Sequence, residues 1–142
     1  VDFNRAMNDV NEGKQALANL ETMLAPKQKE LEAEQSELQR MGAEFETQAP
    51  VLSADARAKK EAELRQKAMT LQQKNMMAQE EAARMFQAIN DDLKTKLQSE
   101  LSKIAKAKGY TLVIESSLVM YGGEGMDLTD DLIKAYNAAN AK

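Results

Sequence analysis

The longest uninterrupted stretch of the sequence does most to limit the folds open to this chain. Residues 54–108 contain neither glycine nor proline, and Gly109 follows where glycine commonly closes a helix. Apolar side chains recur through the stretch at helical spacing. They are Leu64, Ala68, Leu71, Ala78, Ala82, Met85, Ile89, Leu93, Leu97, Leu101 and Ile104. The pattern predicts one amphipathic helix, roughly 80 Å long at about 1.5 Å per residue.

A second long helix is predicted over residues 11–48. An apolar residue returns every seven positions, as in a coiled-coil seam, at Leu17, Leu24, Leu31, Leu38 and Phe45. Polar side chains occupy the intermediate seam position at Lys27, Glu34 and Gln48. Pro50 ends this helix, and Ser53 is a suitable N-cap for the next one. We therefore expect an antiparallel, coiled-coil-like α-hairpin arm over residues 11–108, with its tip near residues 49–53.

The composition argues against several classes of function. The chain has no cysteine and no histidine, so it lacks a thiol nucleophile, the commonest general base and the commonest metal ligand. Its net charge of −4 argues against a dedicated nucleic-acid binder. No apolar run approaches the length that would span a bilayer. We predict a protein that is not an enzyme and that binds no metal, cofactor or nucleic acid.

A short apolar segment near the end of the chain has a sequence pattern typical of β-strands. Residues 110–115 and 118–121 predict the two strands of a β-hairpin, and residues 1–3 are a candidate third strand. An isolated hairpin is marginal in water, and one that is apolar on both faces needs cover on both. We expect residues 1–10 and 109–142 to form a small β-containing body that associates with other copies of the chain. The residues expected to hold this body together are Leu112, Val113, Ile114, Leu118, Val119 and Tyr121.

Both ends of the sequence carry a recognisable pattern, VDFNRAMND at the start and AKAKGYTLVIESSLVMYGGEGMDLTDDLIKAYN near the end. The second block has a Gly-Tyr entry into the first predicted strand. It also has an Asp-Leu-Thr motif, residues 127–129, which opens a last short helix with Thr129 as a plausible N-cap. In these blocks the chain resembles the Skp/OmpH family of periplasmic chaperones of Gram-negative bacteria.

The resemblance implies a fold and a function. The fold would be a mainly α homotrimer, with helical arms that project from a small trimeric β-barrel body and enclose a cavity. The function would be that of an ATP-independent holdase, which binds unfolded outer-membrane proteins in the cavity and prevents their aggregation in transit through the periplasm. A signal peptide would have been removed before Val1.

Contacts with such clients are expected on the thinly packed seam of the lower arms, where apolar surface should stay open. The candidates are Met41, Phe45, Leu52, Met69, Met76 and Met77. Methionine suits adaptable binding surfaces, because its side chain is unbranched and polarisable. Ordinary helix packing is the alternative role for these residues.

The charge is distributed unevenly along the arm. Residues 12–52 carry four basic and eight acidic side chains, and residues 53–108 carry twelve basic and eight acidic ones. The sequence pI of about 5.0 departs from the strongly basic type of the family. Attraction to an anionic membrane or lipopolysaccharide is therefore expected only near the tip. The candidate residues for it are Arg57, Lys59, Lys60 and Arg65.

A function from another class stays open. A non-enzymatic coiled-coil scaffold that binds one fixed partner at the cell envelope would show the same helical pattern. The interrupted seam favours the chaperone, because a scaffold would profit from a stiff arm. Binding to several unrelated unfolded proteins would distinguish the two.

Overall fold

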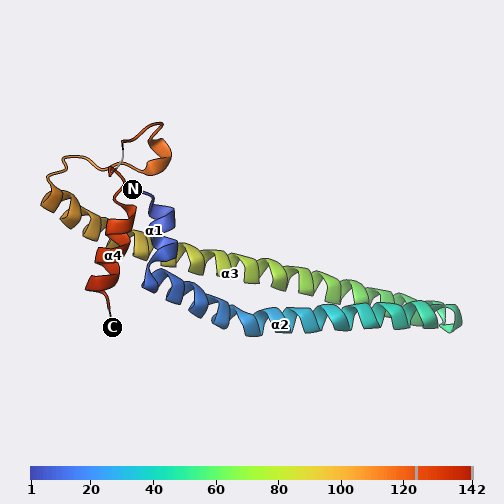
Figure 1. Ribbon diagram of the computed structural model, residues 1–142. Helices are drawn as coiled ribbons and strands as arrows, with labels where there is room; N and C mark the ends of the chain where they lie inside the picture. Colours follow the sequence, from blue (N-terminus) through green and yellow to red (C-terminus); the bar gives the residue numbers. More distant parts are fainter. Residues whose placement is uncertain (124, 142) are drawn as a thin grey trace. The chain divides into compact units, whose positions relative to one another are not determined.

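The structure is a computed structural model that describes residues 1–123 and 125–141, and these residues are mostly helical (Figure 1). The elements in this part of the chain are α1 (Phe3–Asp9), α2 (Asn11–Gln48), the 3₁₀ turn η1 (Ala49–Val51), α3 (Ala54–Lys108), the 3₁₀ turn η2 (Ser116–Leu118) and α4 (Thr129–Ala139). The chain divides into two compact units. The terminal unit consists of Val1–Leu20 and Met85–Lys142, and the hairpin unit consists of Glu21–Arg84.

In the hairpin unit, α2 and α3 are antiparallel neighbours joined by η1 (Figure 1). The hairpin agrees with the sequence prediction, and so do the bounds of both helices. Pro50 lies at the start of η1, and the Ser53 hydroxyl accepts a hydrogen bond from the Ala56 N–H at 3.3 Å. Local signals therefore place this turn: a proline that stops one helix and an N-cap that begins the next.

The C-terminal end of α3 is closed by glycine, as predicted. Gly109 has a φ of +75°, a left-handed conformation that favours glycine. The Tyr110 N–H bonds the Ala105 carbonyl at 2.9 Å, and the Gly109 N–H bonds the Lys106 carbonyl at 3.2 Å. These two bonds satisfy carbonyl groups that the end of a helix otherwise leaves free.

The terminal unit has the larger apolar core. Its buried residues are Val1, Ala6, Val10, Leu93, Leu97, Leu101, Leu128, Leu132 and Tyr136. Leu97 and Leu132 have no exposed surface, and α1 packs against α4. The core therefore joins the two ends of the chain through the last turns of α3.

The expectation of a β body is wrong for the chain that the structure describes, in which no residue belongs to a strand or sheet. Residues 110–115 are extended, but residues 116–118 form η2, so the second apolar run does not fold back to pair with the first. Two backbone bonds resemble a sheet. The Val1 ammonium bonds the Ile114 carbonyl at 3.2 Å, and the Ser116 N–H bonds the Val1 carbonyl at 2.7 Å. One pair of backbone hydrogen bonds does not make a β-ladder, so the described residues form no barrel.

The candidate strand at residues 1–3 is likewise wrong, because α1 begins at Phe3. Asp2 is its N-cap, and its carboxylate accepts the Arg5 N–H at 2.8 Å. A carboxylate suits this position because it satisfies a free N–H group of the first turn. The first two residues instead connect α1 to residues 114–116.

The start of α4 also differs from expectation, because Thr129 is its first residue and not its cap. The Asp127 carboxylate accepts both the Thr129 N–H, at 2.9 Å, and the Thr129 hydroxyl. Thr129 is fully buried, and its Oγ1 accepts the Asp2 N–H at 2.8 Å. The Asp-Leu-Thr motif therefore ties the start of α4 to the start of the chain.

Candidate functional site

The candidate binding surface follows the seam between α2 and α3 in the hairpin unit. Leu31 and Leu71 are buried in this seam. Next to these two leucines the seam becomes polar. Lys74 of α3 pairs with the Glu34 carboxylate of α2. The Asn75 amide donates to the Leu71 carbonyl at 3.1 Å. The hydrogen bond to Glu34 is the main cause of a raised Lys74 pKa. Charge replaces apolar packing at this layer, so the helices are only loosely packed there.

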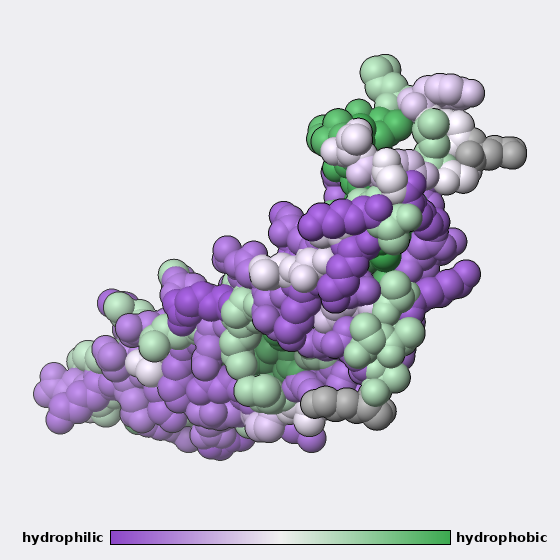
Figure 2. Space-filling view, turned by 90° about the vertical axis from the view of Figure 1, so that its left-hand side faces the viewer, coloured by the Kyte–Doolittle hydropathy of each residue, from purple (hydrophilic) through white to green (hydrophobic). Residues whose placement is uncertain are grey.

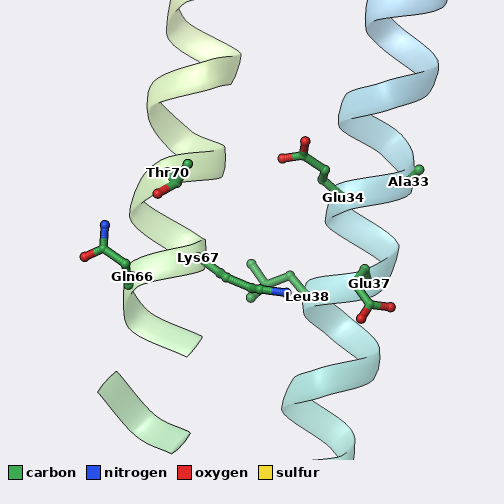
Figure 3. Close-up of a pocket in the computed structure, with 7 residues that line it drawn as sticks. All are labelled: Ala33, Glu34, Glu37, Leu38, Gln66, Lys67 and Thr70. Atoms are coloured by element: carbon green, nitrogen blue, oxygen red, sulfur yellow. The ribbon is translucent and has the colours of Figure 1, made fainter. Parts of the chain in front are cut away.

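Two grooves lie along the seam. One, of about 460 Å³, is lined by Ala33, Glu34, Glu37, Leu38, Gln66, Lys67 and Thr70 (Figure 3). The other, of about 470 Å³, is lined by Gln35, Leu38, Ala68, Leu71, Gln72, Asn75, Met76 and Gln79. In Figure 3, Lys67 of α3 reaches toward Leu38 of α2 across the space between the helices. Leu38 borders both grooves, so each has an apolar part that another molecule could reach.

Three of the predicted client contacts point into solvent from α3. Met69, Met76 and Met77 are 60%, 56% and 61% exposed. Met69 and Met76 are seven residues apart and share a helix face, whereas Met77 lies about 100° further round. Met76 also lines the second of these grooves, next to Leu38 and Leu71. Together they place flexible apolar side chains at the edge of the open seam.

The other three predicted contacts, Met41, Phe45 and Leu52, are half-buried. Met41 and Phe45 line a hollow of about 90 Å³ near the turn. The Met41 sulfur accepts a hydrogen bond from the Lys67 ammonium at 3.2 Å. Met41 and Phe45 thus face α3, and all three side chains have less open surface than the three methionines on α3.

The four basic residues predicted near the tip fall into two pairs. Arg57 donates to the Ala49 carbonyl at 2.6 Å, and Lys60 donates to the Gln48 side chain, so both hold the turn closed. Lys59 and Arg65 are exposed, and neither has an ion-pair partner among the described residues. Arg57 and Lys60 use some of their donors on the turn, whereas Lys59 and Arg65 extend from α3 without such a bond to the turn.

The residues predicted to hold copies of the chain together lie in an exposed apolar segment, residues 110–121. Leu112, Leu118 and Tyr121 are 74%, 76% and 90% exposed, while Val113 is half-buried against the core. Ile114 and Val119 are less exposed, at 46% and 40%. Figure 2 shows hydrophobic, green residues gathered at the top of the view, over this segment. Apolar patches of this kind commonly mark interaction surfaces.

Sequence reasoning missed a polar cluster in the terminal unit that links α2, α3 and α4. The Glu12 carboxylate accepts the Tyr136 hydroxyl at 2.5 Å and the Lys96 ammonium at 2.6 Å, and Lys96 also pairs with Asp92 at 2.7 Å. The bond from Lys96, followed by that from Tyr136, lowers the Glu12 pKa. Burial and the bond to Glu12 raise the Tyr136 pKa. The phenol thus stays protonated and donates to a charged acceptor, which makes a stronger bond than a neutral pair.

Gly13 is a second residue that sequence reasoning missed. A Cβ atom added there would lie 1.9 Å from the Met7 carbonyl oxygen and 3.1 Å from Leu93. The backbones of α1 and α2 therefore approach each other closely at this point, with α3 beside them. The available signal was a glycine inside an otherwise helical pattern, which often marks close packing.

The described residues offer neither a metal site nor a membrane-spanning helix. No group of three or more histidine, cysteine, aspartate or glutamate side chains is arranged to hold a metal ion within residues 1–123 and 125–141. Nor does any helix in that part of the chain combine the length and apolar character needed to cross a membrane.

A family model described as "Outer membrane protein (OmpH-like)" matches residues 1–136. The chain belongs to the OmpH-like family. The resemblance seen in the two terminal sequence blocks is thereby confirmed. The family match spans both units of the structure.

Individual relatives of this OmpH-like chain are distant. Outer membrane protein 26 of Haemophilus influenzae is 35% identical over 43 residues, which cover 30% of this chain and 22% of that protein. The crystal structure of a proposed outer membrane chaperone (OmpH-like) from Caulobacter crescentus CB15 matches with a TM-score of 0.81 at 24% identity. That match covers 96% of this chain and 80% of the other. At this identity it shows a shared fold.

Proposed function

We propose that the protein is an ATP-independent holdase, which binds unfolded outer-membrane proteins and prevents their aggregation in the periplasm. Membership of the OmpH-like family supports a chaperone role for outer-membrane proteins, as does the description of the solved relative. The observation that carries the proposal is the open seam of the hairpin unit, with Met69, Met76 and Met77 exposed beside it.

The chemistry of this surface suits clients without a fixed shape. Methionine side chains adapt to irregular apolar partners, and Leu38 gives each groove an apolar part. Each contact would be weak, but many of them along one unfolded chain would add up through multivalency. Release would follow when the client folds and withdraws its apolar side chains.

Dilution of urea-denatured outer-membrane proteins into buffer, followed by light scattering, tests this function. We expect near-stoichiometric amounts of the protein to suppress the aggregation of several unrelated β-barrel clients without ATP. A protein that ignores all denatured clients and binds one folded partner would be a scaffold, and the proposal would fail. Cell fractionation tests the location, with recovery in the periplasmic fraction as the expected result.

We also propose that the protein works as a homotrimer. Residues 1–10 and 109–142 would form the association region, and residues 11–108 would form the client-binding arm. The exposed apolar segment, residues 110–121, supports association because Leu112, Leu118 and Tyr121 are largely uncovered within the described chain. The number of copies rests on the family resemblance, and sedimentation analysis measures it directly.

For contact with an anionic membrane or lipopolysaccharide we propose Lys59 and Arg65. Arg57 and Lys60 are weaker candidates, because both donate to the turn that they hold closed. Binding to anionic vesicles should weaken with added salt and fall in a Lys59→Gln, Arg65→Gln variant. Unchanged binding in that variant would remove the role from both residues.

A further inference from the structure

The nine methionines are the most readily oxidised side chains of this chain, because it contains no cysteine, histidine or tryptophan. Six of them are exposed by more than half of their surface: Met23, Met69, Met76, Met77, Met120 and Met126. Half of this exposed set lies in one short stretch of α3. That stretch is the surface proposed above to bind clients.

The exposed thioethers of α3 contrast with those of the half-buried methionines. Met7 packs against the core of the terminal unit, and Met85 is half-buried. Met41 is half-buried, and its sulfur accepts a hydrogen bond from Lys67. A dissolved oxidant therefore reaches the sulfur atoms of Met69, Met76 and Met77 more easily than those of these three.

We propose that Met69, Met76 and Met77 form an oxidation-sensitive surface, at which peroxide converts thioethers to sulfoxides and thereby weakens client binding. The inference rests on the proposed holdase function. In each reaction the O–O bond of hydrogen peroxide breaks and one oxygen atom bonds to sulfur. The sulfur loses two electrons, and the peroxide is reduced to water.

The consequence for binding follows from the position of these side chains. A sulfoxide is polar, so a client would have to desolvate it in order to place an apolar side chain against it. The fold should tolerate the change, because the three side chains are exposed and contribute little to the core. Sulfoxides can be reduced back by methionine sulfoxide reductases, so the loss of binding would be reversible.

The first test maps oxidation without reference to function. The protein is treated with hydrogen peroxide and digested, and each methionine peptide is followed over time by mass spectrometry. We expect Met69, Met76 and Met77 to be oxidised several-fold faster than Met7, Met41 and Met85. Equal rates in the two groups would overturn the inference.

The second test measures the affinity for a urea-denatured outer-membrane protein before and after peroxide treatment. The wild type should lose affinity several-fold, whereas a Met69→Leu, Met76→Leu, Met77→Leu variant should keep it. Met23→Leu is the matched control, because it removes an exposed methionine of α2 and should give no protection. Circular dichroism should show the same helix content throughout.

The outcomes separate this inference from the function on which it rests. An untreated wild type that does not bind denatured clients would contradict the holdase function. An untreated wild type that binds, but keeps its affinity after oxidation, would contradict only the oxidation-sensitive surface. An equal loss in the triple leucine variant would also overturn it, since the loss would then come from other methionines.

Discussion

At the scale of single residues, Gly13 offers the sharpest prediction. In Gly13→Ala the new methyl group would meet the Met7 carbonyl oxygen at 1.9 Å, so α1 and α2 would have to move apart. We expect this overlap alone to cost about 1–3 kcal/mol of the free energy of unfolding, as in overpacked cores. This cost should exceed the gain of about 1 kcal/mol from the better helix propensity of alanine. Urea unfolding followed by circular dichroism measures the difference.

Gly42 provides the matched control, because nothing lies within 4 Å of a Cβ atom added there. Gly42→Ala should therefore stabilise the protein, by about 0.5–1 kcal/mol, through helix propensity alone. We therefore predict that Gly13→Ala lowers the free energy of unfolding and that Gly42→Ala raises it. If both substitutions stabilise the protein, the close approach at Gly13 is not rigid.

Glu12 should give the stability of the protein a dependence on pH. Its pKa is lowered in the folded state, so its contribution is complete above the ordinary value of 4.5 and is lost as the pH falls through the folded value. Glu12→Gln should lower the free energy of unfolding at neutral pH by about 1 kcal/mol, a modest figure because the carboxylate is partly exposed. The variant should then lose less stability than the wild type on acidification.

Urea unfolding at neutral and acidic pH measures this change in slope. Glu32→Gln is a suitable control, because Glu32 is exposed and its carboxylate accepts a hydrogen bond from Gln28 of the same helix. The same pH dependence in wild type and Glu12→Gln would show that the cluster with Lys96 and Tyr136 adds no stability.

These residues also show where prediction from the sequence stops. Glu12 and Tyr136 are 124 positions apart, and neither belongs to a motif that would pair them. The same limit applies to the predicted basic cluster, since the sequence could not show that Arg57 and Lys60 donate hydrogen bonds to the turn. Residue types and spacing identified these side chains, but their partners depend on the folded arrangement.

At the scale of elements, the approximate bounds of the two long helices could be predicted from the sequence. Their ends are set by Pro50, Ser53 and Gly109, and each of these acts on its own neighbours. The prediction of strands was wrong, because a ladder needs a partner that a local apolar pattern does not provide. In the described chain, residues 116–118 turn as η2 and leave residues 110–115 without one.

The loose packing of the hairpin can be tested by amide hydrogen exchange. Within α3 we expect fast exchange near the turn and slow exchange around Leu93, Leu97 and Leu101, which are almost fully buried. Asn75→Leu should slow exchange in neighbouring turns and raise the free energy of unfolding by about 1 kcal/mol, because it places an apolar side chain in the seam. Exchange around Leu97 should not change. Uniform protection along wild-type α3 would indicate a stiff arm and favour a scaffold.

At the scale of the whole molecule, the central question is what covers residues 110–121. Val113 already packs against the core of the terminal unit, whereas Leu112 and Leu118 are about three-quarters exposed. A charge at Val113 would therefore disturb the fold of the chain itself. A charge at Leu112 or Leu118 should act only on contacts between copies, so these positions separate folding from association.

We expect Leu112→Glu with Leu118→Glu to dissociate the wild-type oligomer, because association would bury two charges without partners. Sedimentation at micromolar concentration should show the wild type as an oligomer and the variant as a monomer with unchanged helix content. Met23→Glu is the control, since it adds a charge at an exposed apolar position of α2 and should leave the assembly intact. A wild type that is monomeric under these conditions would contradict the proposed trimer. A double variant that stays assembled would place the interface outside residues 110–121.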